Sequence, residues 1–494
     1  MTVATIHIKD EINIIVRGLS IADYSELSNI FAVYAKGFRH QARYKLGHWD
    51  GKIRFCDKQG KTYVRLLPEI LNFLRIRKYG IKLVDDRAKY NLTVQPIDNQ
   101  YFQCRGIDIT LGDHQVRGVN ALLSEAGGIF EGGTGAGKTL MAAVLALLYE
   151  EERKLRTIII VPTSDLIDQT YDELTRVGVD VGVYGGTKKD IDHKHLVSTW
   201  QSLQNNKGLI GQYHIVIVDE CHGVSGLVLQ EILNKHGACC RVRMGLTGTL
   251  PEEDIDKMAV RVTMGDVVEG VEASELIAVG WLAELHLYCY SLIEDLRSEY
   301  HKFCDENPID AAKLTYRKFK SEYFKDYIAE KKYIQKKPER LQMLANLVAK
   351  PPGNSLVLVP NIAFGRAITK LVPNAVFFYG ADSKAVRKEL YKSFEEEDDV
   401  IAITTYSLGS TGLNIKRIFN LFLIDPGKSY VQVIQSIGRG LRKAFDKVRV
   451  NVYDIHSDLK FSRRHASIRK KHYKNKKYPY KETKVDYMEL IGEL

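Results

Sequence analysis

A glycine-rich stretch, GGTGAGKT, runs from Gly132 to Thr139 and fits the pattern GxxxxGK[ST]. Glycines in such a loop let backbone N–H groups surround phosphates at the start of a helix, where the helix dipole favours anions. We expect Lys138 to reach the β- and γ-phosphates of ATP and Thr139 to bind Mg²⁺. The predicted phosphate-binding residues are Gly132, Gly133, Thr134, Gly135, Ala136, Gly137, Lys138 and Thr139.

An acidic pair, Asp219 and Glu220, opens the sequence DECH and directly follows the apolar run IVIV. An acidic residue at the carboxyl end of a parallel strand lies where ligands bind in open α/β sheets. We predict that Asp219 binds Mg²⁺ and that Glu220 orients and deprotonates the attacking water. With the phosphate loop, the pair predicts ATP hydrolysis.

A third set of polar residues lies far along the chain, in VIQSIGRGLRK. A helix over 430–442 would place Gln435, Arg439 and Arg442 on one face. Arginine offers fixed donors to a phosphoryl group whose charge spreads in the transition state. We predict that all three are catalytic, with Arg442 as an arginine finger acting across a cleft and Arg439 as its γ-phosphate partner.

Two series of short β-branched runs, each alternating with helical patterns, would position these residues. The first series begins at Gly127 and the second at Asn354. Apolar strands separated by helices are typical of doubly wound parallel sheets. The predicted strands of the first series are 127–131, 157–162, 214–219 and 241–248, and those of the second are 355–360, 375–380, 400–405, 421–425 and 450–455.

This pattern predicts an α/β protein with two doubly wound parallel-sheet domains and a small, separate N-terminal α+β domain. The region between the two series is rich in Lys, Glu and Tyr and has few strand signals, which favours a helical linker. The predicted divisions are a basic DNA-binding domain over 1–98, a first α/β domain over 99–275, a helical linker over 276–345, a second α/β domain over 346–457 and a basic C-terminal segment over 458–494.

Positive charge is concentrated in two places. The chain has 71 Lys and Arg against 61 Asp and Glu, a formal charge of +10. Residues 34–66 hold nine Lys/Arg against two Asp, and residues 460–477 hold nine against none. Segregated charge of this kind favours a polyanion, because neutralised phosphates release counterions.

The first basic stretch also contains Tyr44, Trp49 and Phe55. Cations interleaved with aromatic rings suit phosphate contact and base stacking. The alternative is that these aromatic residues form a small core. The predicted DNA contacts of this stretch are Arg43, Lys45, Trp49 and Lys52.

Other features exclude several classes of protein. The longest apolar run, 141–148, is too short to span a bilayer, and the N-terminus lacks an apolar signal segment, so we expect a cytoplasmic protein. None of the seven cysteines forms a zinc-binding spacing, which predicts reduced thiols and no zinc site.

Taken together, these motifs resemble the superfamily 2 helicases and translocases. DECH resembles their DExH box, VPTSDLIDQ from Val161 their motif Ia, and WQSL at Trp200 their motif Ic. LTGT from Leu246 occupies the place of their Ser-Ala-Thr coupling motif, and VIQSIGRGLRK matches QxxGRxxR. The resemblance implies two RecA-like domains that bind ATP and Mg²⁺ and move along a nucleic-acid strand.

Two further motifs carry residue roles by this resemblance. LGDHQVRGV from Leu111 resembles the element whose glutamine reads adenine, so Gln115 is assigned to ATP. TTYSLGSTGLNIK from Thr404 resembles motif V, with Asn414 where the group commonly has an acidic residue. The positions that the resemblance assigns to gripping a DNA strand are Pro162, Thr163, Gly185, Gly186, Thr199, Asn361 and Thr405.

The basic N-terminal stretch and the GSTGLNIK form of motif V resemble the UvsW group of phage helicases, which remodels branched DNA and R-loops. This implies an ATP-dependent DNA helicase that unwinds and branch-migrates forked or junction DNA in replication, recombination or repair. Its expected partners are single-stranded, forked and junction DNA and the RNA of R-loops, with the protein acting as a monomer. Two alternatives stay open: an RNA helicase with the same core, and an ATP-gated nucleic-acid clamp that does not unwind.

Overall fold

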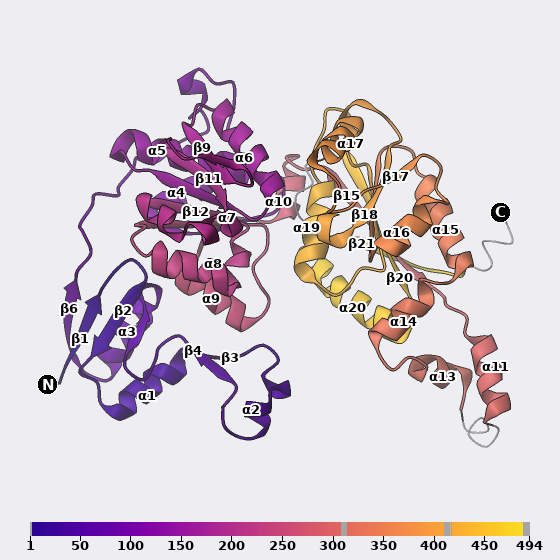
Figure 1. Cartoon of the computed structure of the whole chain (residues 1–494), viewed down its shortest axis with the longest axis horizontal. Helices are drawn as coiled ribbons and strands as arrows, with labels where there is room; N and C mark the ends of the chain where they lie inside the picture. The colour runs from indigo at the N-terminus through magenta and orange to yellow at the C-terminus, as the bar shows by residue number, and fades with distance from the viewer. Residues whose placement is uncertain (1, 308–313, 410–414, 416, 488–494) are drawn as a thin grey trace. The chain divides into compact units, whose positions relative to one another are not determined.

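The structure is a computed structural model that describes residues 2–307, 314–409, 415 and 417–487 (Figure 1). The chain divides into two compact units, Met1–Val271 and Glu272–Leu494. Each unit is built around its own parallel α/β sheet.

The N-terminal part of the first unit is a small mixed sheet with the strand order β5-β2-β1-β6. Strand β1 alternates between buried and more exposed residues, which places Ala4, Ile6 and Ile8 in the core. Helix α3, amphipathic and begun by a proline in its first turn, covers this core with Leu74. The elements are β1 (Val3–Ile8), β2 (Asn13–Arg17), α1 (Ile21–Ile30), β5 (Lys61–Tyr63), α3 (Leu67–Ile76) and β6 (Gly80–Asp85).

A two-stranded ribbon extends from this small sheet. Strand β3 (Ala32–Tyr34) pairs antiparallel with β4 (Lys52–Arg54), and the loop between them contains the short helix α2 (Ala42–Lys45). The ribbon carries most of the first basic stretch.

An eight-stranded sheet follows, with the order β10-β9-β11-β8-β12-β13-β7-β14, in which only β10 is antiparallel to its neighbour. Helix α5 is apolar on nearly every side and lies buried, as expected of a helix packed among other layers. The strands are β7 (Gly127–Gly132), β8 (Thr157–Val161), β9 (Val181–Gly185), β10 (Lys188–Asp190), β11 (His195–Thr199), β12 (Ile215–Asp219), β13 (Val242–Thr247) and β14 (Val267–Val271). The helices are α4 (Asp113–Ser124), α5 (Lys138–Arg153), α6 (Ser164–Arg176), α7 (Trp200–Asn205), α8 (Leu227–Glu231) and α9 (Asp254–Met264).

The small N-terminal sheet is not separate from this α/β domain, in contrast to the prediction. Ala259 and Val262 of α9 belong to the same buried cluster as Ile6 and Leu74. Arg261 of α9 also forms an ion pair with Glu69 of α3. Because α9 has one apolar face directed at the small sheet, the two parts share a core.

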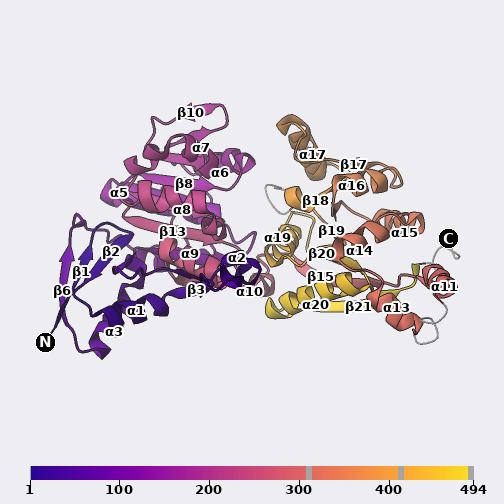
Figure 2. The same cartoon turned by 60° about the horizontal axis from the view of Figure 1, so that its bottom comes forward.

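The second unit contains a seven-stranded parallel sheet with the order β17-β18-β16-β19-β20-β15-β21 (Figure 2). Its strands are β15 (Glu284–Leu292), β16 (Ser355–Val359), β17 (Ala375–Phe377), β18 (Ile401–Thr405), β19 (Asn420–Ile424), β20 (Arg449–Ser457) and β21 (Tyr480–Val485). Its described helices are α10 (Ala273–Ala278), α11 (Arg297–Glu306), α13 (Tyr316–Glu322), α14 (Tyr327–Ile334), α15 (Pro338–Ala349), α16 (Ile362–Thr369), α17 (Lys384–Glu396), α18 (Tyr406–Gly409), α19 (Tyr430–Gly440) and α20 (Lys460–Asn475).

Two predicted divisions of this unit are wrong in part. The region 276–345 is not a purely helical linker, because β15 lies inside the sheet between β20 and β21. The segment 458–494 is not a separate tail, because α20 and β21 complete the same sheet. The apolar alternation of Leu285, Leu287 and Cys289 was a strand signal, but its partners lie far away in the sequence.

Candidate ATP and nucleic-acid site

The strand order of the first large sheet brings three motifs to one edge. Strands β12, β13 and β7 are neighbours and run parallel. The phosphate loop follows β7, DECH begins at the last residue of β12, and LTGT ends β13. Carboxyl ends of parallel strands form the ligand-binding edge of such sheets. The topology therefore gathers the predicted ATP residues of this unit at adjacent strand ends.

The phosphate loop has the backbone shape that its glycines permit. Gly135 and Gly137 have φ of +90° and +76°. Residues other than glycine rarely adopt this region of backbone conformation. The Lys138 ammonium folds back over the loop and donates to the Gly132 carbonyl at 3.1 Å. Helix α5 begins at Lys138, so its free N–H groups lie beside the loop.

Gln115 contacts the base of this loop. Its side chain is fully buried, accepts from the backbone N–H of Gly112 at 2.8 Å and donates to the carbonyl of Gly137 at 3.2 Å. The neighbouring His114 ring lies 2.9 Å from the Ala136 carbonyl. Helix α4 thus holds the phosphate loop through two side chains, and adenine recognition by Gln115 stays a prediction.

The DECH carboxylates lie against the loop lysine. The Glu220 Oε1 atom is 3.9 Å from Lys138 Nζ. Although burial opposes ionisation, Lys138 and His222 hold the pKa of Glu220 below its usual range. Burial, and then the charge of Glu220, raise the pKa of Asp219. A half-buried carboxylate whose charge is disfavoured in this way suits a divalent cation, so Asp219 fits the predicted Mg²⁺ site.

Glu220 also adopts an unusual backbone conformation. Its φ and ψ are both 50°, which is the left-handed region for a residue with a side chain. Strain of this kind persists where the surrounding structure fixes it and is frequent at functional sites.

The DECH and LTGT motifs contact one another, which sequence separation alone could not show. The His222 Nδ1 atom lies 3.1 Å from the Thr247 hydroxyl and 3.3 Å from the Glu220 carboxylate. The Thr247 hydroxyl lies 3.3 Å from the same carboxylate. A change of charge at Glu220 therefore alters the hydrogen bonds of Thr247 at the end of β13 directly.

The predicted strand-gripping residues of this unit occupy the other half of the same edge. Pro162 and Thr163 follow β8, Gly185 ends β9 and Thr199 ends β11, and these three strands are neighbours. Thr199 begins α7 and accepts from the Ser202 N–H at 3.3 Å. Gly186, in the turn after β9, has a φ of +60°.

Thr163 has a feature that its motif did not predict. Its buried hydroxyl has no hydrogen-bond partner among the residues that the structure describes. A buried hydroxyl without a hydrogen-bond partner costs free energy. Contact of this edge with a nucleic-acid backbone stays a prediction.

In the second unit, Asn361 and Thr405 follow or end the neighbouring strands β16 and β18. Asn361 begins α16, and its side chain accepts from the Phe364 N–H at 2.9 Å. The Thr405 hydroxyl lies 3.0 Å from that of Ser407. The two residues therefore share one edge of the sheet, and their contact with a DNA strand stays a prediction. Asn414 of motif V lies outside the described residues.

The helix that carries the arginine motif is shorter than predicted. Helix α19 ends at Gly440, so Gln435 and Arg439 lie on it but Arg442 does not. The Lys447 side-chain nitrogen closes the end of the helix by donating to the carbonyls of Gly440 and Arg442. Because the chain turns there to enter β20, Arg442 is placed by this turn and not by helical spacing.

Gln435 and Arg439 are both largely buried, at 6% and 9% exposure. A helix with these side chains on its buried face is not a solvated basic helix. This burial favours the functional interpretation of the motif over a merely charged surface.

The ribbon brings three of the four predicted N-terminal contacts together. The Arg43 guanidinium lies 4.9 Å from the Trp49 ring, and Trp49 Nε1 donates to the Lys52 carbonyl at 2.9 Å. Lys45 lies exposed at the end of α2. Phe55, by contrast, is buried in the core of the small sheet, so the core alternative holds for that residue.

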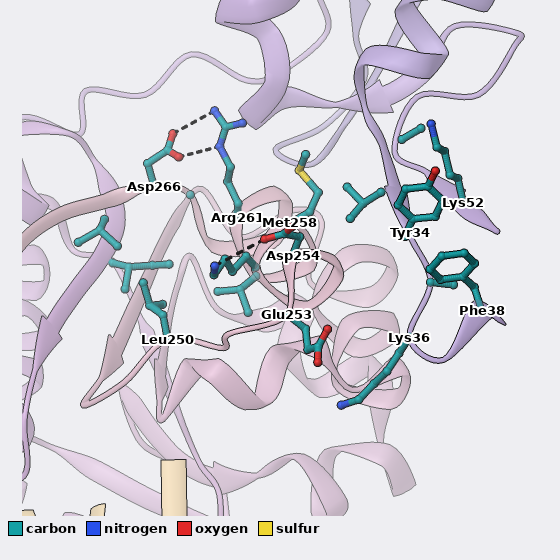
Figure 3. A pocket seen from close by; sticks show the side chains of 18 of the residues that line it. Tyr34, Lys36, Phe38, Lys52, Leu250, Glu253, Asp254, Met258, Arg261 and Asp266 are labelled. Carbon is teal, nitrogen blue, oxygen red and sulfur yellow. Dashed lines mark hydrogen bonds and ion pairs between the residues drawn. The ribbon is translucent and has the colours of Figure 1, made fainter. Parts of the chain in front are cut away.

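A pocket of ≈ 710 Å³ lies between this ribbon and α9 (Figure 3). Tyr34, Phe38 and Lys36 line the ribbon side, where the rings of Tyr34 and Phe38 stack at 4.5 Å. The Lys52 ammonium lies 5.2 Å from the Tyr34 ring. Sequence reasoning did not single out Tyr34 and Phe38, although their place within the basic stretch was a signal.

No helix in the described part of the chain is long and apolar enough to cross a membrane.

Three family models match successive parts of the chain. Residues 7–85 match the N-terminal domain of the DNA helicase UvsW, and residues 108–252 match the res subunit of type III restriction enzymes. Residues 339–444 match the conserved C-terminal domain of helicases. The matched segments include the ribbon, the phosphate loop with DECH, and the arginine motif.

Relatives with similar sequences span almost the whole chain. The ATP-dependent DNA helicase uvsW of Enterobacteria phage T4 is 26% identical over 483 residues, which cover 91% of this chain and 90% of that one. Putative helicase 22 of a Sulfolobus islandicus filamentous virus is 21% identical over 488 residues, which cover 91% and 81%.

A solved fragment of a putative HsdR subunit of a type I restriction enzyme from Vibrio vulnificus shares the fold. It has a TM-score of 0.55 at 17% identity and covers 76% of this chain and 68% of that one. S. cerevisiae Dbp5 bound to RNA has a TM-score of 0.53 at 14% identity and covers 81% and 96%. Both likenesses concern the fold alone.

Proposed function

The chain belongs to the superfamily 2 DNA helicases, and on that premise we propose that it unwinds and branch-migrates forked or junction DNA in replication, recombination or repair. One observation carries the proposal. The ATP residues at the ends of β7, β12 and β13 share a sheet edge with the candidate strand-gripping residues at the ends of β8, β9 and β11. The residues for ATP hydrolysis and those for strand contact therefore lie on the same sheet.

The chemistry of the first unit follows from its side chains. Backbone N–H groups of the phosphate loop and the Lys138 ammonium hold the phosphates. Mg²⁺, when bound by Thr139 and Asp219, would neutralise charge on the β- and γ-phosphate oxygens. Glu220, whose carboxylate Lys138 keeps ionised, accepts a proton from the attacking water.

Arg439 and Arg442 act on the same γ-phosphate in this proposal. Guanidinium donors stabilise charge that spreads over the phosphoryl oxygens in the transition state. Gln435 lies one turn before Arg439 on α19 and orients the water or the phosphate. The Glu220–His222–Thr247 contacts give the release of phosphate a direct route to the end of β13.

The substrate of the motor is the finer part of the proposal. The T4 relative is named a DNA helicase, and the N-terminal match is to a DNA helicase domain. The ribbon supplies Arg43, Trp49 and Lys52 as a second contact for a DNA arm, which a junction offers and a single strand does not. We expect a monomer that acts in the cytoplasm, that of the host if the chain is phage-encoded.

ATP-driven unwinding on a labelled panel tests the proposal. The panel contains duplex DNA, a fork, a four-way junction, an R-loop and duplex RNA, each measured with and without ATP and Mg²⁺. We expect the fork and junction to be processed fastest, with R-loops also unwound. Preference for duplex RNA would favour the RNA helicase, and nucleotide-dependent binding without strand separation would favour the clamp.

A further inference from the structure

Helix α20 carries five cationic side chains on one exposed face. At 100° per residue they fall within an arc of about 100°, and at a rise of 1.5 Å per residue they extend over about 20 Å. None of them forms an ion pair with another described residue. The five, named here the α20 stripe, are Lys460, Arg463, Arg464, Lys471 and Lys474.

The opposite face of α20 is fixed by buried polar contacts. Arg469 donates to both carboxylate oxygens of Asp454 on β20, at 2.8 and 2.7 Å, and Tyr473 donates to the same carboxylate at 2.8 Å. Arg469 also donates to the Pro426 carbonyl at 2.8 Å, in the turn that leads to α19. The stripe is therefore held in one orientation on the sheet.

The first turn of α20 is closed by protein groups. The buried Glu330 carboxylate of α14 accepts from the backbone N–H groups of Phe461 and Ser462, at 2.8 and 2.6 Å. The helix N-terminus is thus already occupied, and any anion drawn to this face must be recognised by the side chains of the stripe.

The positive surface continues onto α13. A pocket of ≈ 580 Å³ between α13 and the start of α20 is lined by Arg317 and Lys318 as well as by Lys460 and Arg463. Both α13 residues are exposed. Lys320, in the same pocket, is neutralised by Asp458 at 2.8 Å, which leaves the other four cations of the pocket without an ion pair in the described structure.

The composition of the face selects among polyanions. Phe461 packs against a buried cluster and Tyr473 is fully buried, so the stripe offers no aromatic ring for stacking on unpaired bases. The opposite side of α20 is mostly polar and is buried against β20 and α14, so the helix has no free apolar face to insert into a lipid surface. What remains is a line of separate cations at a spacing that suits a regular row of phosphates.

We propose that the α20 stripe, together with Arg317 and Lys318, binds the sugar-phosphate backbone of duplex DNA. This rests on the proposed function in one respect: the duplex is the arm that the motor has yet to open. Because Arg469 ties the helix to the turn before α19, the duplex contacts belong to the same rigid unit as Arg439.

The experiment compares two triple variants of the full chain. Arg463→Gln/Arg464→Gln/Lys471→Gln removes three charges from the stripe, and Lys350→Gln/Lys370→Gln/Lys388→Gln removes three exposed charges elsewhere in the same unit. Fluorescence anisotropy with a blunt duplex and with a single strand of equal length is recorded over a series of KCl concentrations. The slope of log affinity against log salt counts phosphate contacts.

We expect the slope of log duplex affinity against log salt concentration to be smaller in magnitude by about three in the stripe variant, about one for each lost phosphate contact. Its single-strand slope and single-strand-stimulated ATPase should match those of the wild type. The control variant should keep all these values, and Arg463→Lys/Arg464→Lys should keep the duplex slope because it keeps the charge.

Two results would overturn the inference. The first is a duplex slope of the stripe variant equal to that of the control variant, while the stripe variant still hydrolyses ATP with DNA. This result would mean that the stripe does not bind duplex DNA, and it would leave the proposed function intact. Equal losses on single strand and duplex would make the stripe part of the translocation track instead. Absence of DNA-stimulated hydrolysis in the wild type would instead count against the proposed function.

Discussion

The side-chain amide of Gln115 donates to the Gly137 carbonyl at 3.2 Å, so the base of the phosphate loop is held by α4. We predict that Gln115→Ala raises the KM for ATP about fivefold, because one hydrogen bond contributes about 1 kcal/mol. Thermal unfolding of the first unit should also begin at a lower temperature, since the Gly112 N–H loses its acceptor.

A comparison of nucleotides separates this positioning role from adenine recognition. If Gln115 acts by holding the loop, the KM values for ATP and GTP rise by the same factor. A rise for ATP alone, with unchanged thermal stability, would mean that Gln115 leaves the loop and contacts the base.

Lys138→Ala should abolish ATP hydrolysis while DNA binding stays within a few-fold of the wild type. In the proposed mechanism the ammonium contacts phosphate and lowers the pKa of Glu220, whereas the candidate strand-gripping residues of this unit follow or end β8, β9 and β11. Phosphate release with saturating DNA measures the effect, and Lys154→Ala, at an exposed position just after the same helix, is the control. Turnover at the wild-type rate in Lys138→Ala would mean that the loop does not belong to the active site.

Arg442→Ala should bind ATP normally yet lose about 10³-fold or more in turnover, as expected for loss of an arginine finger. Arg439→Ala should lose a similar factor. Equilibrium binding of a fluorescent ATP analogue and steady-state hydrolysis separate the two effects. If both variants hydrolyse ATP nearly as fast as the wild type, the arginine motif does not reach the phosphate.

The ribbon should contribute to binding of branched DNA through the exposed Arg43 and Lys45 and the partly exposed Lys52. Deleting residues 1–98 would uncover Ala259 and Val262 of α9, so charge removal is a better test than truncation. Arg43→Gln/Lys45→Gln/Lys52→Gln should weaken junction binding and lower its salt slope by about 0.9 for each phosphate that the ribbon no longer neutralises. Single-strand-stimulated ATPase should be retained.

The matched control for the ribbon is Lys58→Gln/Lys82→Gln/Lys89→Gln, three exposed lysines of the same domain. Anisotropy with a labelled four-way junction compares the two triples. Indistinguishable junction affinities would mean that the ribbon serves folding or a protein contact.

Lys447 predicts a pH dependence of stability in the second unit. Burial, and then the charge of Arg442, lower the pKa of Lys447 from 10.5 to about 7. Between these values the unfolded chain binds a proton that the folded chain does not, so stability rises with pH. Relative to Lys447→Met, the wild type should gain about 1.4 kcal/mol per pH unit over this window. Urea unfolding from pH 7 to 9.5 measures it, and a difference independent of pH would refute the depressed pKa.

The sequence allowed prediction of the parts whose signals are local. Apolar runs such as 158–161 and 215–218 predicted parallel strands, and the motifs at their ends predicted where the ATP residues meet. Helices α5 and α6 directly follow the phosphate loop and β8, as the predicted alternation of strands and helices requires.

What sequence could not provide depends on contacts between distant segments. Phe55 lies in a basic stretch, yet its neighbours in the small sheet bury it. The end of α19 at Gly440 depends on Lys447, which closes the helix from outside its pattern. The Glu220–Thr247 contact needs the pairing of β12 with β13, and no spacing within either motif specifies that pairing.

The position of β15 between β20 and β21 affects the order in which the chain can fold as the ribosome synthesises it. The first unit is continuous in sequence, so it can fold as soon as Val271 has emerged. Strand β15 follows almost at once, but both of its partners lie beyond residue 448. Until those partners are synthesised, the apolar face of β15 is uncovered and both of its hydrogen-bonding edges are unpaired. Such edges can pair with other chains. The second sheet can therefore form only after β20 and β21 have been synthesised, whereas the first unit can fold long before that point.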